Sequence, residues 1–204
     1  MTPPLSYPAL KSVLEYVKVE KRIHLMARSK FLQRIDKAIP VYVKQFCMHT
    51  HYLSLDDFQF EVEHKPWYRN EDKKNGKLLM RYLKGRSSVN VDRAIFSCVN
   101  TSQDFSVKLD FTINKLKTMS CNLEALVPII NPRSFSLTDL SLRIDRHTNV
   151  DLEIVRSAQR VIFGRSDEII GLEKLPNKSV YLRRQPLTDV VRIIKYWIQH
   201  GKEV

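Results

Sequence analysis

The sequence predicts a mixed fold between α+β and α/β. We expect short helices first, a mixed β region next and strand–helix units at the C-terminal end. Three patterns support this: apolar residues at helical spacing, alternating residues in the middle, and repeated strand-like runs. Hydrophobic residues make up 43% and charged residues 27% of the 204 residues, which is typical of globular proteins. The predicted boundaries are a helical module at 1–45 and an α/β domain at 46–204, with repeat-like units from about residue 115.

The N-terminal region has the pattern of three short helices. Pro8 fits the first turn of a helix, where proline is tolerated. Further helices are expected at Glu20–Arg28 and Lys30–Ala38, and Pro40 ends the last one. Because helices this short are marginal alone, their apolar faces must pack together or against a partner. The residues at helical spacing in the first helix are Leu10, Val13, Leu14 and Val17.

Alternating residues predict strands in the middle region. Phe58, Phe60 and Val62 alternate with polar residues, as in a strand with one buried face. Further strands are expected at Ala94–Val99 and Phe105–Phe111. The pattern does not give the order of these strands in a sheet.

The C-terminal region contains three short apolar runs that predict parallel strands of one sheet. They cover Leu140–Ile144, Val161–Phe163 and Val180–Leu182, and the spacing from Leu142 to Val161 to Val180 is 19 residues each time. An earlier copy is expected around Leu116–Cys121. Units of this length are close to the leucine-rich-repeat period of about 20 to 29 residues. The region therefore resembles an irregular leucine-rich-repeat layer, and an ordinary open α/β layer is the alternative.

The last segment has the pattern of an amphipathic helix. We expect a helix over Thr188–His200 that buries Val191, Ile194 and Ile198. Gly201 follows it, at a position where glycine commonly ends a helix.

Charge and cysteine content indicate which partners and which cellular compartment to expect for the protein. Lys and Arg number 34 against 22 Asp and Glu, a net charge of +12. A basic surface attracts nucleic acid, anionic lipid or an acidic protein, or is simply solvated. No secretory leader or membrane-spanning run is recognisable, and the cysteines, 3 in all, form no disulfide framework. We therefore expect a cytoplasmic or nuclear protein without a membrane contact.

Two residue groups could carry chemistry. Cys47, His49 and His51 alternate and could ligate zinc, but no fourth ligand accompanies them, so no metal is predicted. Three aromatic residues lie among basic ones, which suits either stacking on single-stranded nucleic acid or burial in a hairpin. They are Trp67, Tyr68 and Tyr82. Phosphate-binding loops and nucleophile elbows are not recognisable, and we expect neither enzyme activity nor a cofactor.

Several segments resemble a known family. Pro4-Leu5, the apolar residues of the first helix, and Arg22-Ile23-His24-Leu25 with Arg28 resemble a degenerate F-box. Later segments resemble the F-box-associated regions that are expanded in nematodes. These are Leu126–Leu137, Val155–Gln159, Leu175–Lys178 and Trp197–Gly201.

The resemblance implies a substrate-recognition subunit of a Skp–cullin–F-box type ubiquitin ligase. The first helices would dock into a groove of a Skp-type adaptor, and through it a cullin, while the C-terminal layer would bind a target protein. Part of the docking set should then stay exposed in the isolated chain. The alternatives are a basic nucleic-acid-binding protein and a stand-alone interaction module that recruits no ligase. The residues implied in adaptor binding are Pro4, Leu5, Leu10, Val13, Leu14, Val17, Ile23 and Leu25.

Overall fold

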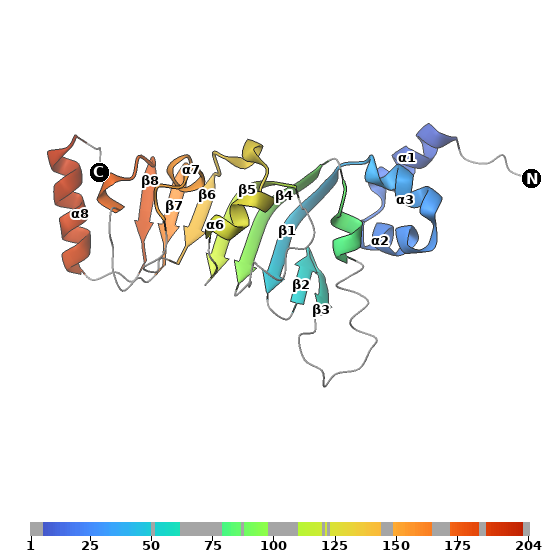
Figure 1. Ribbon diagram of the computed structural model, residues 1–204, viewed down its shortest axis with the longest axis horizontal. Coiled ribbons are helices and arrows are strands. Elements are labelled where there is room, and N and C mark those ends of the chain that lie inside the picture. The colour runs from blue at the N-terminus through green and yellow to red at the C-terminus, as the bar shows by residue number, and fades with distance from the viewer. Residues whose placement is uncertain are drawn as a thin grey trace, which may run out of the picture.

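Three helices open the described part of the chain (Figure 1): α1 (Tyr7–Tyr16), α2 (Val19–Arg28) and α3 (Lys30–Lys37). The computed structural model describes residues 6–49, 52–61, 79–86, 88–97, 110–119, 121, 123–143, 149–164, 172–183 and 187–201. The three predicted N-terminal helices are confirmed. Ser29 separates α2 from α3, and its hydroxyl accepts a hydrogen bond from the Leu32 backbone N–H at 3.3 Å. This N-cap satisfies one of the backbone donors that a helix start leaves free.

The described residues then form one sheet of eight strands, in the order β3-β2-β1-β4-β5-β6-β7-β8. The pairs β1–β2 and β2–β3 are antiparallel, and every pair from β1–β4 to β7–β8 is parallel. From β4 onward each new strand is added next to the one before it. The coarse prediction of a mixed α/β fold is thus confirmed. The strands are β1 (Val41–His49), β2 (Tyr52–Leu55), β3 (Phe58–Glu61), β4 (Val89–Ser97), β5 (Phe111–Met119), β6 (Asp139–Leu142), β7 (Arg160–Phe163) and β8 (Ser179–Leu182).

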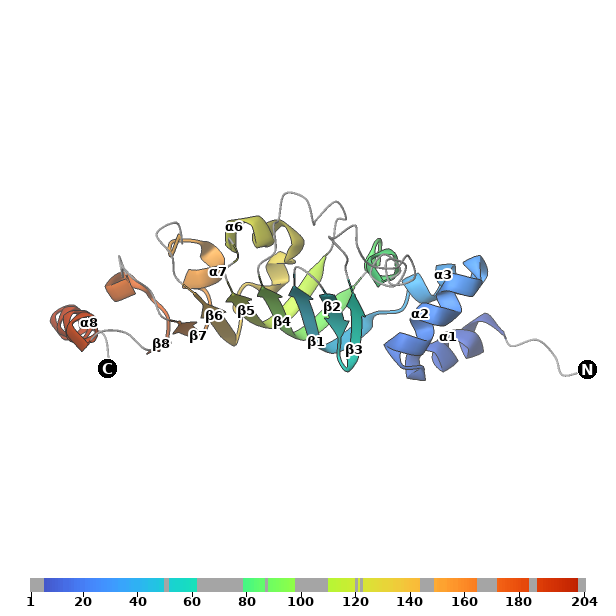
Figure 2. The same cartoon turned by 90° about the horizontal axis from the view of Figure 1, so that it is seen from below.

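Short helical segments connect the parallel strands and lie over one face of the sheet (Figure 2). The last helix, α8 (Leu187–Gln199), stands beyond β8 at the C-terminal end. Most of these segments bury apolar side chains, such as Leu126 and Val155, which are fully buried, whereas the segment 132–134 buries Ser134. The covering segments are α6 (Leu123–Leu126), η1 (Val127–Ile129), η2 (Pro132–Ser134), α7 (Glu153–Arg156) and η3 (Leu172–Lys174).

The three long parallel strands share a break in their alternation. Val43, Val91 and Ile113 are paired neighbours and all are buried. Two polar residues then follow in each strand before the next buried side chain. These next buried residues, Phe46, Ala94 and Leu116, are again paired neighbours. Because the break occurs at the same level in all three strands, the hydrogen-bonded register continues through it.

Buried residues from the helices and the sheet form one continuous apolar core. Leu14 and Ile23 from the helices belong to it, and so does Ile193 of α8. Aromatic rings fill the centre under the long strands, where Phe46 lies 5.8 Å from Phe96 and 5.0 Å from Phe111 between ring centroids. Tilted contacts between aromatic rings add to the stability that the burial of their apolar surface already provides.

The predicted C-terminal strands are confirmed as parallel neighbours, but their predicted offset is partly wrong. Val161 pairs with Val180, which fits the 19-residue spacing. Leu140, not Leu142, pairs with Val161. A shift of two residues keeps every side chain on the same face, so the apolar pattern alone does not distinguish the two registers.

The helix predicted at Thr188–His200 is confirmed, but its buried face is different. Ile193 is fully buried, whereas Val191 is 40% and Ile198 is 67% exposed. Trp197 lies on the same side as Ile193, and its indole N–H donates to the Glu173 carbonyl at 2.7 Å. The inward face therefore runs through Ile193 and Trp197, one position away from the predicted stripe.

The other strand predictions have mixed outcomes. The strand expected from Phe58 is confirmed as β3. The one expected at Ala94–Val99 begins earlier, at Val89. The segment from Phe105 lies outside the described residues until Asp110, and β5 covers Phe111–Met119, where the earlier repeat copy was expected.

Candidate functional site

The three helices leave apolar side chains on their outer surface. On α1, Val13 is 49% exposed and Tyr16 is 91% exposed, and on α2 Leu25 is 38% exposed. We call these three the exposed helix residues. Tyr7 and Phe31 on the same module are also exposed. Large apolar side chains that gather in solvent on one small module mark a candidate protein contact.

The residues implied in adaptor binding occupy different environments. Leu14 and Ile23 are each 2% exposed and belong to the core of the protein itself. Leu10 and Val17 are half-buried. Only the Val13 and Leu25 side chains of this set are exposed among the described residues. The remaining two, Pro4 and Leu5, lie outside the described residues.

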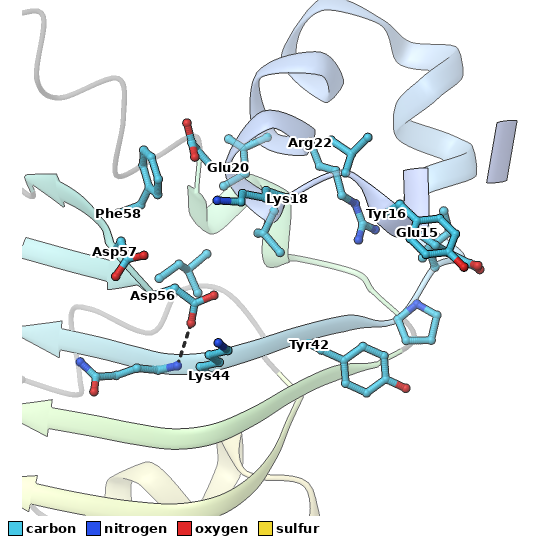
Figure 3. Close-up of a pocket in the computed structure, with 17 residues that line it drawn as sticks. Glu15, Tyr16, Lys18, Glu20, Arg22, Tyr42, Lys44, Asp56, Asp57 and Phe58 are labelled. Carbon is cyan, nitrogen blue, oxygen red and sulfur yellow. Dashed lines mark hydrogen bonds between the residues drawn. The ribbon is translucent and has the colours of Figure 1, made fainter. Parts of the chain in front are cut away.

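A cleft of about 850 Å³ lies between the first two helices and the start of the sheet (Figure 3). Tyr16 and Tyr42 stand at one end of it, and Asp57 and Phe58 at the other. Asp56 in the β2–β3 turn accepts a hydrogen bond from the Gln45 backbone N–H at 2.9 Å and so holds this turn against β1. Cationic and anionic side chains are mixed along its wall: Glu15, Lys18, Glu20, Arg22, Lys44, Asp56 and Asp57.

Behind the cleft, a buried cluster of charges joins α2 and α3 to the turn that precedes β4. Arg22 Nε donates to one carboxylate oxygen of Asp36 at 2.6 Å, and Arg86 donates to the other. All three side chains are at most 4% exposed. We call Arg22, Asp36 and Arg86 the Asp36 cluster. Two guanidinium groups on one carboxylate leave a surplus of donors, and Arg22 Nη2 has no hydrogen-bond partner in the described part of the chain.

Arg86 reaches the cluster because the chain turns sharply before it. Gly85 has φ +70°, a left-handed conformation that side chains other than glycine rarely adopt. Arg86 also donates to the carbonyls of Asp36 at 2.8 Å and Tyr82 at 2.9 Å, and its guanidinium lies 3.8 Å from the Tyr82 ring centre. Burial raises the pKa of Tyr82 to about 12, the cation of Arg86 opposing this and the charge of Asp36 adding to it.

The sheet has one face that the short helices cover and one face that we call the open face. No described helix lies over the open face between β1 and β8 (Figure 2). The pairing register aligns one residue from each of four neighbouring strands in a row across it. Neighbours such as Ala94 and Leu116 are buried on the covered face, so the row points to the other side. This charged row is Arg93, Lys115, Asp139 and Arg160.

Within the charged row, Asp139 lies among cations. Arg160 donates a hydrogen bond to its carboxylate and holds the pKa of Asp139 below its ordinary value. Burial opposes this shift, while the charges of Arg160, Lys115 and Arg93 add to it. Lys115 and Arg93 are therefore close enough for Asp139 to respond to their charge, although Arg160 alone forms the ion pair.

The two other residue groups considered in the sequence form no second site among their described members. Cys47 is buried with its Sγ 3.9 Å from the Tyr52 hydroxyl, and His49 stacks on the Tyr52 ring. His51 lies outside the described residues, which contain no group of three potential metal ligands. Tyr82 is 4% exposed and covers Arg86, so its ring does not offer a stacking surface for a base. The other two aromatic residues of that prediction, Trp67 and Tyr68, are not described.

Comparison with known proteins assigns the greater part of the chain to a protein family. A family model described as "Domain of unknown function (DUF3557)" matches residues 72–204. The chain belongs to this family. The DUF3557 match includes β4 to β8 and α8, whereas α1–α3 and β1–β3 precede it. Neither the curated proteins nor the solved structures contain a match. No helix in the described part of this DUF3557 protein is long and apolar enough to cross a membrane.

Sequence reasoning did not identify the charged row as a site. The signal for it is the pair of polar residues that interrupts each long strand: Lys44-Gln45, Asp92-Arg93 and Asn114-Lys115. In a strand, two consecutive polar residues between apolar ones indicate a local irregularity. Alignment of the three pairs across the sheet requires the strand order, which the sequence alone did not give.

Proposed function

We propose that this chain is a non-enzymatic adaptor that binds one protein through its N-terminal helices and another through its sheet. The exposed helix residues carry the first half of the proposal. Leu14 and Ile23 fill the core from the same helices that present Val13 and Leu25 to solvent. One face of these helices therefore packs into the core and stabilises the fold, and another face is available to bind in the groove of a partner.

The more specific form of the proposal is a substrate receptor of a Skp–cullin–F-box type ligase. The resemblance of the first helices to a degenerate F-box motivates it. The sheet supports it indirectly, since its parallel strands are added in chain order with short helices on one side, an arrangement similar to an irregular leucine-rich-repeat layer. Such layers leave a broad surface free for a target protein.

The test changes two of the exposed helix residues without touching the core. Val13→Asp with Leu25→Asp puts charges where apolar contacts with a Skp-type adaptor are proposed. We expect co-purification of the adaptor and a cullin from the native organism to fall at least about tenfold, because desolvating each unpaired charge costs several kcal/mol. The melting temperature should change little, since both positions are already exposed.

A matched control uses Ser12→Asp with Ala27→Asp, which adds the same charge at exposed positions of the same two helices. It should retain adaptor binding. Leu14→Ser is unsuitable as a surface variant because Leu14 is 2% exposed and its loss destabilises the fold. Undiminished adaptor binding by the folded Val13/Leu25 variant would contradict the proposed interface, and so would failure of the unmodified chain to bring down any Skp-type protein.

A further inference from the structure

The open face carries an excess of positive charge at its centre. In the charged row, three cations face a single carboxylate, and that carboxylate is taken by Arg160. Arg93 and Lys115 form no ion pair with a described side chain. Arg93 is exposed and Lys115 half-buried, so both ammonium and guanidinium groups are within reach of a ligand. This half of the row is an uncompensated cationic surface.

A second row lies two residues further along the same strands. It consists of Ile95, Lys117, Ser141, Ile162 and Tyr181, which pair in register across β4 to β8. Ile95 and Ile162 are half-buried, and Tyr181 is 53% exposed. Arg160 of the charged row lies 5.8 Å from the Tyr181 ring centre, so the two rows are in contact at this end. The second row is thus largely apolar, with one further cation at Lys117.

We propose that the open face binds an extended acidic segment of a partner protein, lying between the two rows. Its acidic side chains meet Arg93 and Lys115, and its alternate side chains, which are apolar, rest on Ile95 and Ile162. This inference rests on the proposed adaptor function, and it specifies the chemistry of the target that the sheet would hold.

Strand geometry fits such a ligand. Neighbouring strands are about 4.8 Å apart, so Arg93 and Arg160 lie roughly 14 Å apart across three spacings. An extended chain covers that distance in about four residues, with successive side chains pointing in opposite directions. One set of side chains then faces the charged row and the other faces the second row. A helix would present a different spacing.

A protein segment suits this surface better than a nucleic acid does. Asp139 in the row would repel a continuous phosphate backbone, whereas spaced carboxylates can avoid it. The half-buried isoleucines match apolar side chains, and the one aromatic ring of the second row, Tyr181, lies at its end beside Arg160. Salt dependence should be moderate, because only a few ionic contacts form.

The test uses a fluorescein-labelled synthetic peptide of alternating glutamate and valine, about 12 residues long, and the full chain. Fluorescence anisotropy measures its affinity. The comparison peptides alternate lysine with valine, or carry the same glutamates and valines in two separate blocks. Arg93→Ala with Lys115→Ala removes two cations from the open face. Lys30→Ala with Arg34→Ala removes two exposed cations from α3 and serves as the control.

We expect the alternating acidic peptide to bind, and the open-face variant to weaken it by about tenfold or more. The α3 control should change the affinity less than about twofold. Absence of binding, equal losses in both variants, or equal affinity for the block peptide would overturn the proposal. So would a single-stranded oligonucleotide that binds more tightly and is lost in the open-face variant, since it would assign the surface to nucleic acid. The Val13/Leu25 variant should bind the peptide normally, which keeps this result separate from that for adaptor binding.

Discussion

Asp36 and Asp139 are both paired with arginine, but they lie in opposite surroundings. Asp36 is fully buried between two arginines, Arg22 of α2 and Arg86 in the turn before β4. Asp139 lies on the open face, where its side chain is 19% exposed and that of Arg160 is 46% exposed. The aspartate–arginine pair therefore stabilises the fold at Asp36, whereas at Asp139 it mainly sets the charge of the open face. Burial decides which, because water weakens an ion pair and also removes the penalty for breaking it.

The largest expected effect is at Asp36. Asp36→Asn leaves two buried guanidinium groups without a counter-charge, and we expect a loss of about 3–5 kcal/mol in the free energy of unfolding. Urea denaturation measures it. Asp151→Asn is the control, because its ion pair with Arg156 is exposed at 81% and 45% and should contribute less than about 1 kcal/mol. Similar losses in the two variants would show that the Asp36 cluster is solvated.

The helices and the buried Asp36 cluster also differ in how far the sequence could predict them. The helices were predictable because their apolar residues recur at helical spacing and because Pro40 ends the series. Arg22 and Asp36 gave no such signal. They lie 14 residues apart, and their third partner, Arg86, is 50 residues beyond Asp36. Only the folded chain brings these three charges together.

The sheet was predictable where its strands are short and regular. Val161–Phe163 and Val180–Leu182 lie within single apolar runs, and both became strands. The long strands were missed or displaced because each contains two opposite alternation patterns joined by a polar pair. In β4, Val89 and Val91 belong to the first pattern and Ala94 and Phe96 to the second. A search for a period of two fits only half of such a strand.

A smaller effect is expected at Tyr82, which covers the Asp36 cluster. Its pKa is 10.0 when unfolded and about 12 when folded, so its contribution to stability is complete below pH 10 and is lost as pH rises through 12. The loss should reach about 2–3 kcal/mol. Tyr82→Phe should remove this alkaline sensitivity, as measured by unfolding at a series of pH values.

At neutral pH, Tyr82→Phe should change stability little, because the buried hydroxyl has no hydrogen-bond partner among the described residues. If unmodified protein and variant lose stability in parallel above pH 10, the Tyr82 ring is not buried against Arg86 in solution.

The smallest effect on stability is expected at Asp139. Arg160 lowers its pKa from the ordinary value of 3.8, so its contribution is present above pH 3.8 and is lost as pH falls through the lower folded value. Asp139→Asn should weaken the dependence of stability on acid pH only slightly, since the pair is exposed.

The same substitution should strengthen the binding of the acidic peptide. The substitution removes the one carboxylate of the charged row and frees Arg160, so the alternating acidic peptide should bind more tightly. Anisotropy titrations at low and high salt check this, and the gain should shrink as salt rises. Unchanged or weaker peptide binding by Asp139→Asn would mean that the ligand does not lie along the row. Asp36→Asn is the control: it changes no charge on the open face, so the folded fraction of this variant should bind the peptide with unchanged affinity.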